Sequence, residues 1–202
     1  MKDDRKTIPE EMIAGGETIS DSLLLARVAR GDTTSFDTLF FRHYERVYGV
    51  LFRLVGNRAE AEDLTQEAFI KLHAHARSGR FRSDENIAAW LYRVATNLGY
   101  NALRDQKRRW QRDRFLVPEP GTGPGTEQTV AILEERTAVR ATLMKLPPRQ
   151  AQLLVLRQVG FSYAECAEIL GVSPGSIGTL LSRAGEAFRQ AYPANRRGEG
   201  VD

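Results

Sequence analysis

The chain has 202 residues, of which 42% are hydrophobic and 27% charged, and its formal net charge is +3. This composition is ordinary for a folded globular protein, so a packed core is expected. No run of about 18 apolar residues occurs, which predicts no membrane span, and the single cysteine, Cys166, excludes an internal disulfide and a Cys-rich zinc site.

The two ends of the chain, residues 1–17 and 193–202, are polar, and we expect mobile tails there. The first of them is charged and lacks the apolar core of a signal peptide, so the sequence predicts a cytoplasmic protein.

Residues 18–114 are predicted to form a first domain of four helices. Apolar residues recur at helical spacing through this part, and glycines or capping residues stand between the segments. The first helix is expected to start at Ser20 or Asp21 and to stop at Gly31, and the second to cover residues 32–55. The third starts at Asn57, with Glu60 as its capping-box partner, and reaches about residue 76. After a polar stretch, the fourth covers residues 86–112.

The third of these helices has an acidic stripe. Asp63, Gln66, Glu67 and Ile70 share one face at offsets of three, four and seven, whereas Leu64, Ala68 and Leu72 share another. An acidic stripe that ends in an apolar residue fits docking to a basic partner surface. From these residues alone, a solvated helix face is the alternative.

The fourth helix combines aromatic, amide and basic residues. Trp90, Tyr92 and Tyr100 stand among Arg93, Asn97 and Asn101, after an Arg80-Phe81-Arg82-Ser83 stretch. Aromatics stack on bases and cations pair with phosphates, so this pattern is typical of single-stranded nucleic-acid binding. Spacing to Val94 also makes Trp90 partly a core residue. Basic residues accumulate at the end of the helix, where a solvated helix end is the alternative to a polyanion site: Arg104, Lys107, Arg108, Arg109, Arg112 and Arg114.

A linker is predicted over residues 115–129, which hold three prolines and three glycines. Residues 130–192 then form a second predicted domain. Its first two helices are expected over 127–145 and over 149–159, with Pro148 in the first turn of the second. The third runs from the cap Ser162 to Gly171, and the fourth from the cap Ser173, followed by Pro174, to about residue 192.

The last two helices have the spacing of a helix-turn-helix. Ala167 is small where two helices would cross, Gly171 supplies a turn with positive φ, and Ile177 anchors the second helix, with Val172 at the corner. That helix would enter the major groove and point Ser176, Thr179, Leu180 and Arg183 outward. A helical hairpin inside a bundle is the alternative. Cys166, beside Ala167, is predicted to be a core residue.

These motifs, in this order, resemble the extracytoplasmic-function (ECF) class of sigma factors in the sigma-70 family, over about residues 20–192. The matching stretches are ARVARGDTTSFDTLFFRHYERVY, AEDLTQEAFIKL, WLYRVATN, LPPRQAQLLVLRQVGFSYAECAEILGVSPGSI and LLSRAGEAFR. The resemblance implies an all-α fold of two small helical domains, the second a four-helix helix-turn-helix domain. It also implies a factor that binds core RNA polymerase, melts specific promoters and directs transcription initiation.

The resemblance further implies three sets of contact residues. Contacts to the clamp of the largest polymerase subunit would come from Asp63, Gln66, Glu67, Phe69 and Ile70. Contacts to the promoter's minus-ten element, including a flipped base, would come from Arg80, Phe81, Arg82, Ser83, Trp90, Arg93, Asn97, Asn101, Arg104, Lys107 and Arg108. Contacts to the minus-thirty-five element would come from Arg149, Ser173, Ser176, Thr179, Leu180 and Arg183, in a domain that also meets the flap of the second polymerase subunit.

The sequence departs from this class in the last helix. A basic residue is common in the class where Gly178, Leu180 and Gly185 stand here, and an Asp where Asn101 stands. The predicted recognition helix therefore offers only Arg183 and Arg189 as cations. Other phosphate contacts would come from neutral donors, the helix N-terminus, Arg149 and Lys145. An anti-sigma factor is a further partner that the class implies.

Two other functions compete with this interpretation. A helix-turn-helix regulator with an N-terminal sensing or dimerisation domain would use the same last helices. An enzyme is disfavoured, because the chain has no Gly-rich phosphate loop or nucleophile motif, and His73 and His75, two apart, point to different helix faces. We therefore expect no catalytic residue, cofactor, metal or small-molecule substrate.

Overall fold

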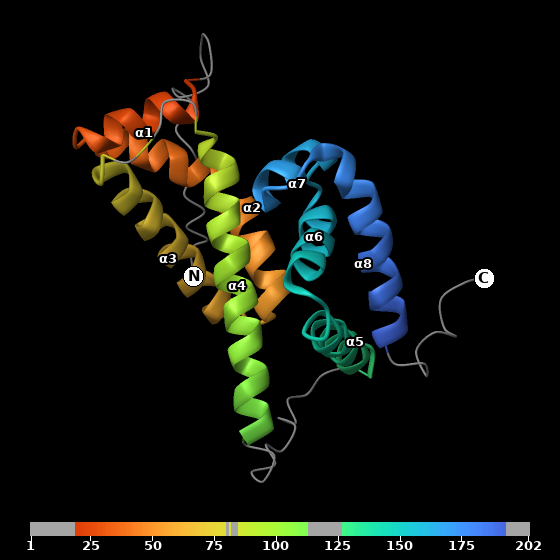
Figure 1. The fold of residues 1–202 in the computed structure, drawn as a ribbon. Helices are drawn as coiled ribbons and strands as arrows, with labels where there is room; N and C mark the ends of the chain where they lie inside the picture. The colour runs from red at the N-terminus through yellow and green to blue at the C-terminus, as the bar shows by residue number, and fades with distance from the viewer. Residues whose placement is uncertain (1–18, 80, 82–84, 113–126, 193–202) are drawn as a thin grey trace.

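The computed structural model describes residues 19–79, 81, 85–112 and 127–192. Throughout these ranges the structure is helical and without β-strands, which confirms the predicted all-α fold. Figure 1 shows two bundles, which we call the first block (α1–α4) and the second block (α5–α8). Their elements are α1 (Asp21–Ala29), α2 (Thr33–Val55), α3 (Arg58–Arg77), α4 (Ile87–Arg112), α5 (Glu127–Leu143), α6 (Pro148–Val159), α7 (Tyr163–Leu170), the 3-10 helix η3 (Pro174–Ser176) and α8 (Ile177–Ala191).

Side-chain caps set the helix starts of the first block. The Asp32 carboxylate accepts from the Ser35 N–H at 3.2 Å at the start of α2, and Asn57 accepts from the Glu60 N–H at 3.0 Å at the start of α3. Each bond satisfies one of the orphan N–H groups that a helix start leaves. The bond between Asn57 and the Glu60 N–H is one of the two bonds of the expected capping box. Gly56, at φ 73°, ends α2 in the left-handed region that favours glycine.

The core of the first block lies around α2, which packs against α1, α3 and α4. Leu39, Leu51 and Leu54 on α2 are fully buried. Gly99 on α4 is also buried and lies so close to α2 that an added Cβ would be 2.7 Å from Leu54 Cδ1. This close contact fixes the position of α4, the helix that carries most of the predicted minus-ten residues.

The second block begins with the helix predicted from residue 127 and contains a helix-turn-helix. Because α5 starts at Glu127, the last three residues of the predicted 115–129 linker are helical. The Ser162 hydroxyl accepts from the Glu165 N–H while the Glu165 carboxylate accepts from the Ser162 N–H, a complete capping box for α7. Gly171 ends α7 at φ 63°. Cys166 is fully buried, as predicted, and burial raises the pKa of its thiol.

The predicted cap at Ser173 is confirmed in position but not in its bonding. Residues 174–176 form the 3-10 helix η3, and the Ser173 side chain makes no capping bond to a backbone N–H. Its hydroxyl instead lies 2.6 Å from the Ser176 hydroxyl. The regular α8 therefore begins only at Ile177, one turn later than the sequence predicts.

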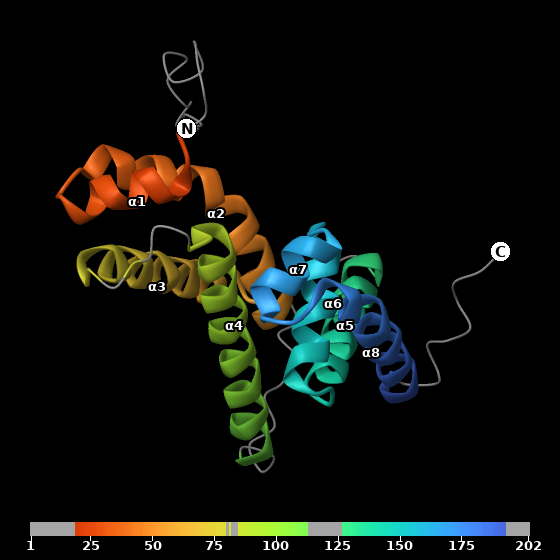
Figure 2. The ribbon, with the colours of Figure 1, turned by 45° about the horizontal axis from the view of Figure 1, so that its top comes forward.

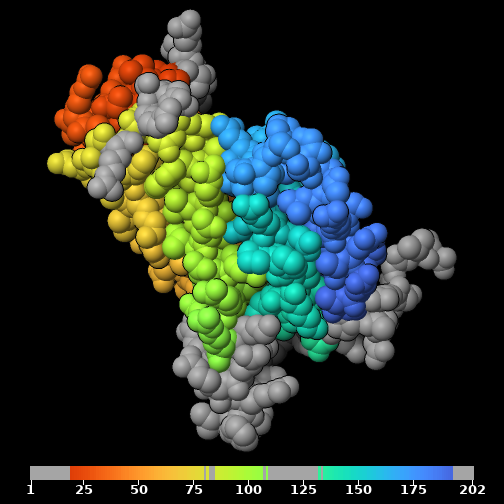
Figure 3. Space-filling view, viewed as in Figure 1, coloured from red at the N-terminus to blue at the C-terminus, as the bar shows by residue number. Residues whose placement is uncertain are grey.

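The two blocks pack against each other. Contacts join α2 to α6 and α4 to α7, and smaller contacts join α2 to α5 and α4 to α6. Figure 2 shows α7 beside the upper half of α4, and the space-filling view in Figure 3 shows no break between α4 and the second block on this face. In the ranges that the structure describes, no helix is both long and apolar enough to cross a bilayer.

Candidate functional site

The acidic stripe of α3 lies on the surface. Asp63 and Gln66 are exposed, and Ile70 is 66% exposed although it is a large apolar residue. Glu67 pairs with Lys71 one turn on, with 3.2 Å between Oε1 and Nζ. The opposite side of α3 packs inward through Ala68 and Leu72, so the stripe is a free face on a firmly held helix.

Phe69 is not part of this exposed stripe. It is 2% exposed, and its ring lies 4.7 Å from the Phe40 ring and 6.5 Å, edge-on, from the Phe36 ring. Phe69 lies one residue from Ile70, about 100° around the helix, which turns it toward α2. In this structure Phe69, one of the predicted polymerase contacts, is therefore a core side chain that packs beneath the stripe.

Five predicted minus-ten residues form a line on α4, which we call the α4 stripe: Arg93, Asn97, Asn101, Arg104 and Arg108. Their spacing of three or four residues places them on one helix face, and all five are exposed. Arg108 pairs with Asp105 at 3.5 Å. Lys107 also belongs to α4. The predicted contacts Arg80, Arg82 and Ser83 lie outside the described residues.

The upper end of the α4 stripe contacts the second block. Arg93 donates from Nε to the Ile169 carbonyl at 2.8 Å and from an Nη to the Glu168 carbonyl at 2.7 Å. The Asn97 side-chain oxygen accepts from the Gln152 amide at 2.9 Å. Figure 1 shows that the lower end of α4 extends past α5 and α6. The remaining stripe residues, Asn101, Arg104 and Arg108, are exposed.

An aromatic cluster lies beside the first turns of α4. Trp90 stacks on His75 with 4.4 Å between ring centroids, and Phe81 meets His75 edge-on at 6.2 Å. His75 is held by Glu85, 3.1 Å from its Nε2. The sequence indicated only that His75 is a poor metal ligand, and no local pattern predicted that its ring contacts both Trp90 and Phe81.

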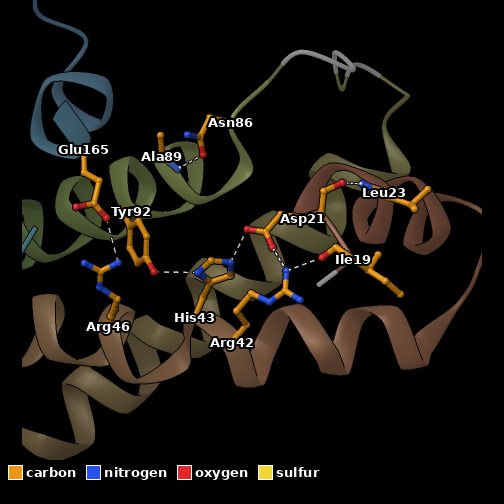
Figure 4. A network of polar contacts seen from close by, with 11 residues as sticks. Ile19, Asp21, Leu23, Arg42, His43, Arg46, Asn86, Ala89, Tyr92 and Glu165 are labelled. Atoms are coloured by element: carbon orange, nitrogen blue, oxygen red, sulfur yellow. Dashed lines mark hydrogen bonds and ion pairs between the residues drawn. The ribbon is translucent and has the colours of Figure 1, made fainter. Parts of the chain in front are cut away.

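A polar network joins three helices of the first block (Figure 4). The Asp21 carboxylate lies 2.7 Å from His43 Nε2, and the Tyr92 hydroxyl lies 2.9 Å from His43 Nδ1. Arg42 also pairs with Asp21. Burial would raise the pKa of Asp21, but hydrogen bonds and charges from His43 and Arg42 outweigh it and hold the pKa below its ordinary value. Burial raises the pKa of Tyr92 to about 12.

The helix-turn-helix presents a mostly polar face. Ser173, Ser176, Thr179 and Arg183 are exposed, as is Arg149 near the start of α6. Ile177 and Ala184 are buried and hold α8 to the second block. Leu180, predicted to point outward, is only partly exposed and packs against the core, so it is less available than its neighbours.

Two family models match the chain, each within one block. The model "Sigma-70 region 2" matches residues 39–109, and the model "Sigma-70, region 4" matches residues 136–186. The ECF RNA polymerase sigma factor SigW of Bacillus subtilis is 30% identical over 176 residues, which cover 82% of this chain and 93% of that protein.

Two solved structures share the fold. CnrH, solved in complex with the cytosolic domain of CnrY, gives a TM-score of 0.59 at 23% identity and covers 84% of this chain and 95% of its own. The sigma factor RpoE from Bartonella quintana, solved with the anti-sigma factor NepR, gives a TM-score of 0.50 at 24% identity and covers 80% and 98%.

Proposed function

Since the chain belongs to the ECF sigma factors of the sigma-70 family, which bind RNA polymerase and direct promoter-specific transcription initiation, we propose which of its surfaces perform each step. The observation that carries the proposal is the match of one block to region 2 and the other to region 4. A helix-turn-helix regulator with a sensing domain is not favoured, because the first block matches a polymerase-binding region.

The α3 stripe docks on core polymerase, at the clamp of its largest subunit. Asp63 and Gln66 supply negative charge and polar groups to a basic surface, and the exposed Ile70 supplies apolar area at the end of the stripe. Complementary charge steers such encounters and fixes their register, and a buried apolar residue near the centre contributes most of the affinity.

The α4 stripe binds the minus-ten element as it melts. Opening duplex DNA costs on the order of 1.4 kcal/mol per base-pair step in stacking. Each unstacked base captured on an aromatic returns about 1–3 kcal/mol. Trp90 and Phe81, whose rings contact His75, provide such aromatic surface, while Arg104 and Arg108 hold phosphates. Binding energy alone therefore nucleates the opening, and no catalytic residue or cofactor takes part.

The second block reads the minus-thirty-five element and meets the flap of the second polymerase subunit. Arg183 is the one described side chain on the outer middle of α8 that carries positive charge; Ser173, Ser176 and Thr179 add neutral donors, and Arg149 reaches a phosphate from α6. This contact is selective and electrostatically weak beside the α4 stripe. An anti-sigma factor is the regulator we expect for the chain, by likeness to RpoE, which is solved with one.

Run-off transcription with purified core polymerase and a panel of promoters tests the proposal. The wild-type chain should confer initiation on a subset of promoters. Reversing Asp63 and Glu67 to Lys should abolish both initiation and co-purification with core polymerase. The matched control reverses Asp37 and Glu45, an exposed acidic pair on α2, and should keep both activities. Initiation that survives the α3 reversal would refute the docking assignment.

A further inference from the structure

A cavity lies where the end of α2 meets α5, α6 and α8. Its volume is about 640 Å³, and sites for small organic molecules typically have about 300–1,000 Å³. None of the residues that we assign to polymerase or promoter contacts is among the described residues that line it. The proposed function therefore leaves this cavity without a role.

The walls of the cavity are mostly apolar and are held in place. Phe52 lines it from α2 and Phe188 from α8. Each ring stacks on a tyrosine one turn away, Phe52 on Tyr48 with 5.7 Å between ring centroids and Phe188 on Tyr192 with 5.5 Å. Leu143 of α5, which is 4% exposed, adds an aliphatic wall. The walls thus offer a preformed surface to the apolar body of a ligand.

Three arginines line the same cavity. Arg53 lies in the last turn of α2, and Arg136 and Arg140 lie on α5. The two arginines of α5 are four residues apart, so they share one helix face and repel each other. Among the described residues around the cavity there is no Asp or Glu. Apolar walls are thus combined with three positive charges and, within this described lining, no negative one.

Arg140 is the cation whose position is best defined. It is half-buried, and its guanidinium lies so close to Gly56 that an added Cβ there would overlap it. The guanidinium donates to Thr137 Oγ1 at 3.3 Å, and it forms no ion pair with a carboxylate of the described ranges. Burial lowers the pKa of Arg140, and the charge of Arg136 lowers it further.

A purely structural role does not account for Arg140. A cation is favoured at the C-terminal end of a helix such as α2, but the Arg140 guanidinium donates to no carbonyl of α2, and most of its five N–H donors remain available. Removing a charged group from water without a counter-charge is unfavourable. An anion in the cavity would supply that counter-charge and would also relieve the repulsion along α5.

We propose that this cavity binds a small amphiphilic anion, a molecule with an apolar aromatic or aliphatic body and one carboxylate, sulfonate or phosphate head. The head pairs with Arg136 and Arg140, because a planar guanidinium matches two oxygens of such a group at once. The body lies against Phe52 and Phe188, and Arg53 adds positive charge at the end of α2. This binding site goes beyond the proposed function and does not depend on it.

Fluorescence titration of the full chain tests the site with the probe 1-anilinonaphthalene-8-sulfonate, an aromatic body with one anionic head. Four competitors separate the requirements. Decanoate and decyl phosphate have a body and a head, and they distinguish a carboxylate from a phosphate. Decanol has the same body without charge, and inorganic phosphate has charge without a body.

Three variants locate the binding. Arg136→Gln with Arg140→Gln removes two charges from the cavity. The matched control, Arg30→Gln with Arg77→Gln, removes two exposed arginines that do not line it. Val139→Trp enlarges a side chain of the cavity wall and keeps all three arginines. Circular dichroism checks that each variant keeps its helices.

The wild type should bind one probe per chain, and decanoate or decyl phosphate should displace it, whereas decanol and inorganic phosphate at the same concentration should not. The cavity double variant should bind the probe about tenfold more weakly, since it loses charge-assisted hydrogen bonds to the head. The control should match the wild type, and Val139→Trp should not bind the probe. If the double variant lost its helices, Arg136→Gln alone, a change at an exposed residue, should still weaken binding.

Four results would overturn the proposal. The absence of binding with one probe per chain would remove the site, and equal affinity in wild type and cavity double variant would remove the arginines from it. Displacement by decanol as effective as by decanoate would make it an apolar pocket without a preference for anions. Displacement by inorganic phosphate alone would make it a plain anion site.

Discussion

Two glycines in neighbouring helices allow the packing of α4 on α2 to be measured. Gly99 on α4 and Gly49 on α2 lie inside helices, and replacing either by alanine removes backbone freedom from the unfolded chain. Both substitutions therefore gain about 1 kcal/mol of helix stability. Their surroundings differ: an added Cβ at Gly99 would be 2.7 Å from Leu54 Cδ1 and 3.1 Å from Leu51 Cδ2, whereas at Gly49 the nearest atom is Arg53 Nη1 at 3.4 Å.

The magnitude follows from these distances. Carbon atoms pack at about 3.5–4.0 Å, so at Gly99 the leucine side chains or α4 itself must shift. Overpacking of this kind costs about 1–3 kcal/mol. Gly49→Ala should therefore raise the free energy of unfolding by about 1 kcal/mol, and Gly99→Ala should lie about 1–3 kcal/mol below it. Because the helix term is common to both, the difference between the two variants isolates the packing term.

Chemical denaturation followed by circular dichroism measures both variants against the wild type, and a shift in Tm of about 2–4 °C per kcal/mol provides a second reading. Equal stabilisation by the two alanines would refute the argument, since it would mean that α4 does not approach α2 closely at Gly99. A displaced α4 should in addition weaken minus-ten binding in the Gly99 variant alone.

Three further outcomes are expected. Neutralising Arg104, Lys107 and Arg108 to Gln should lower the slope of log affinity against log salt for promoter DNA by about 0.9 for each phosphate that the variant no longer neutralises; an unchanged slope would mean that these side chains do not bind phosphates. Phe69→Ala should lower the free energy of unfolding by about 3–5 kcal/mol. Ile70→Ala should change it by less than about 0.5 kcal/mol and should weaken polymerase binding. Similar destabilisation by both variants would contradict the assignment of Phe69 to the core and of Ile70 to the exposed face. Folding lowers the pKa of Asp21, so the stability that Asp21 contributes should be complete above its ordinary pKa of 3.8 and should disappear as the pH falls through the lower folded value. Urea titrations give the free energy of unfolding of wild type and Asp21→Asn. A difference between the two proteins that is the same at pH 6 and at pH 2 would exclude this.

Local rules predicted most helix ends. Asp32 with Gly56, and Ser162 with Glu165 and Gly171, act through bonds or backbone angles within a few residues, so the sequence contains the whole determinant. Ser173 shows the limit of such rules. The Ser-Pro pair is typical of a helix start, but the following turn closes as a 3-10 helix and the hydroxyl turns to Ser176.

The candidate site was predictable in composition and less so in arrangement. The α3 stripe followed from spacing, but the inward turn of Phe69 depends on Phe36 and Phe40, which belong to another helix. The contacts of Arg93 with residues 168 and 169 join positions about 75 residues apart, and no periodicity or cap encodes such a pairing. Predicted as two domains joined by a linker, the blocks also share an interface that sequence patterns could not reveal.

Tyr92 gives the molecule a thermodynamic linkage between its two halves. Its hydroxyl belongs to the His43–Asp21 network at the start of α1, and its ring belongs to the contact with Phe161. One side chain thus enters two equilibria, the cohesion of the first block and the docking of the second. Coupling free energies are reciprocal. If docking of the second block favours the Tyr92–His43 bond by some factor, formation of that bond favours docking by the same factor. A change at Asp21, on α1, would then shift the population of docked molecules.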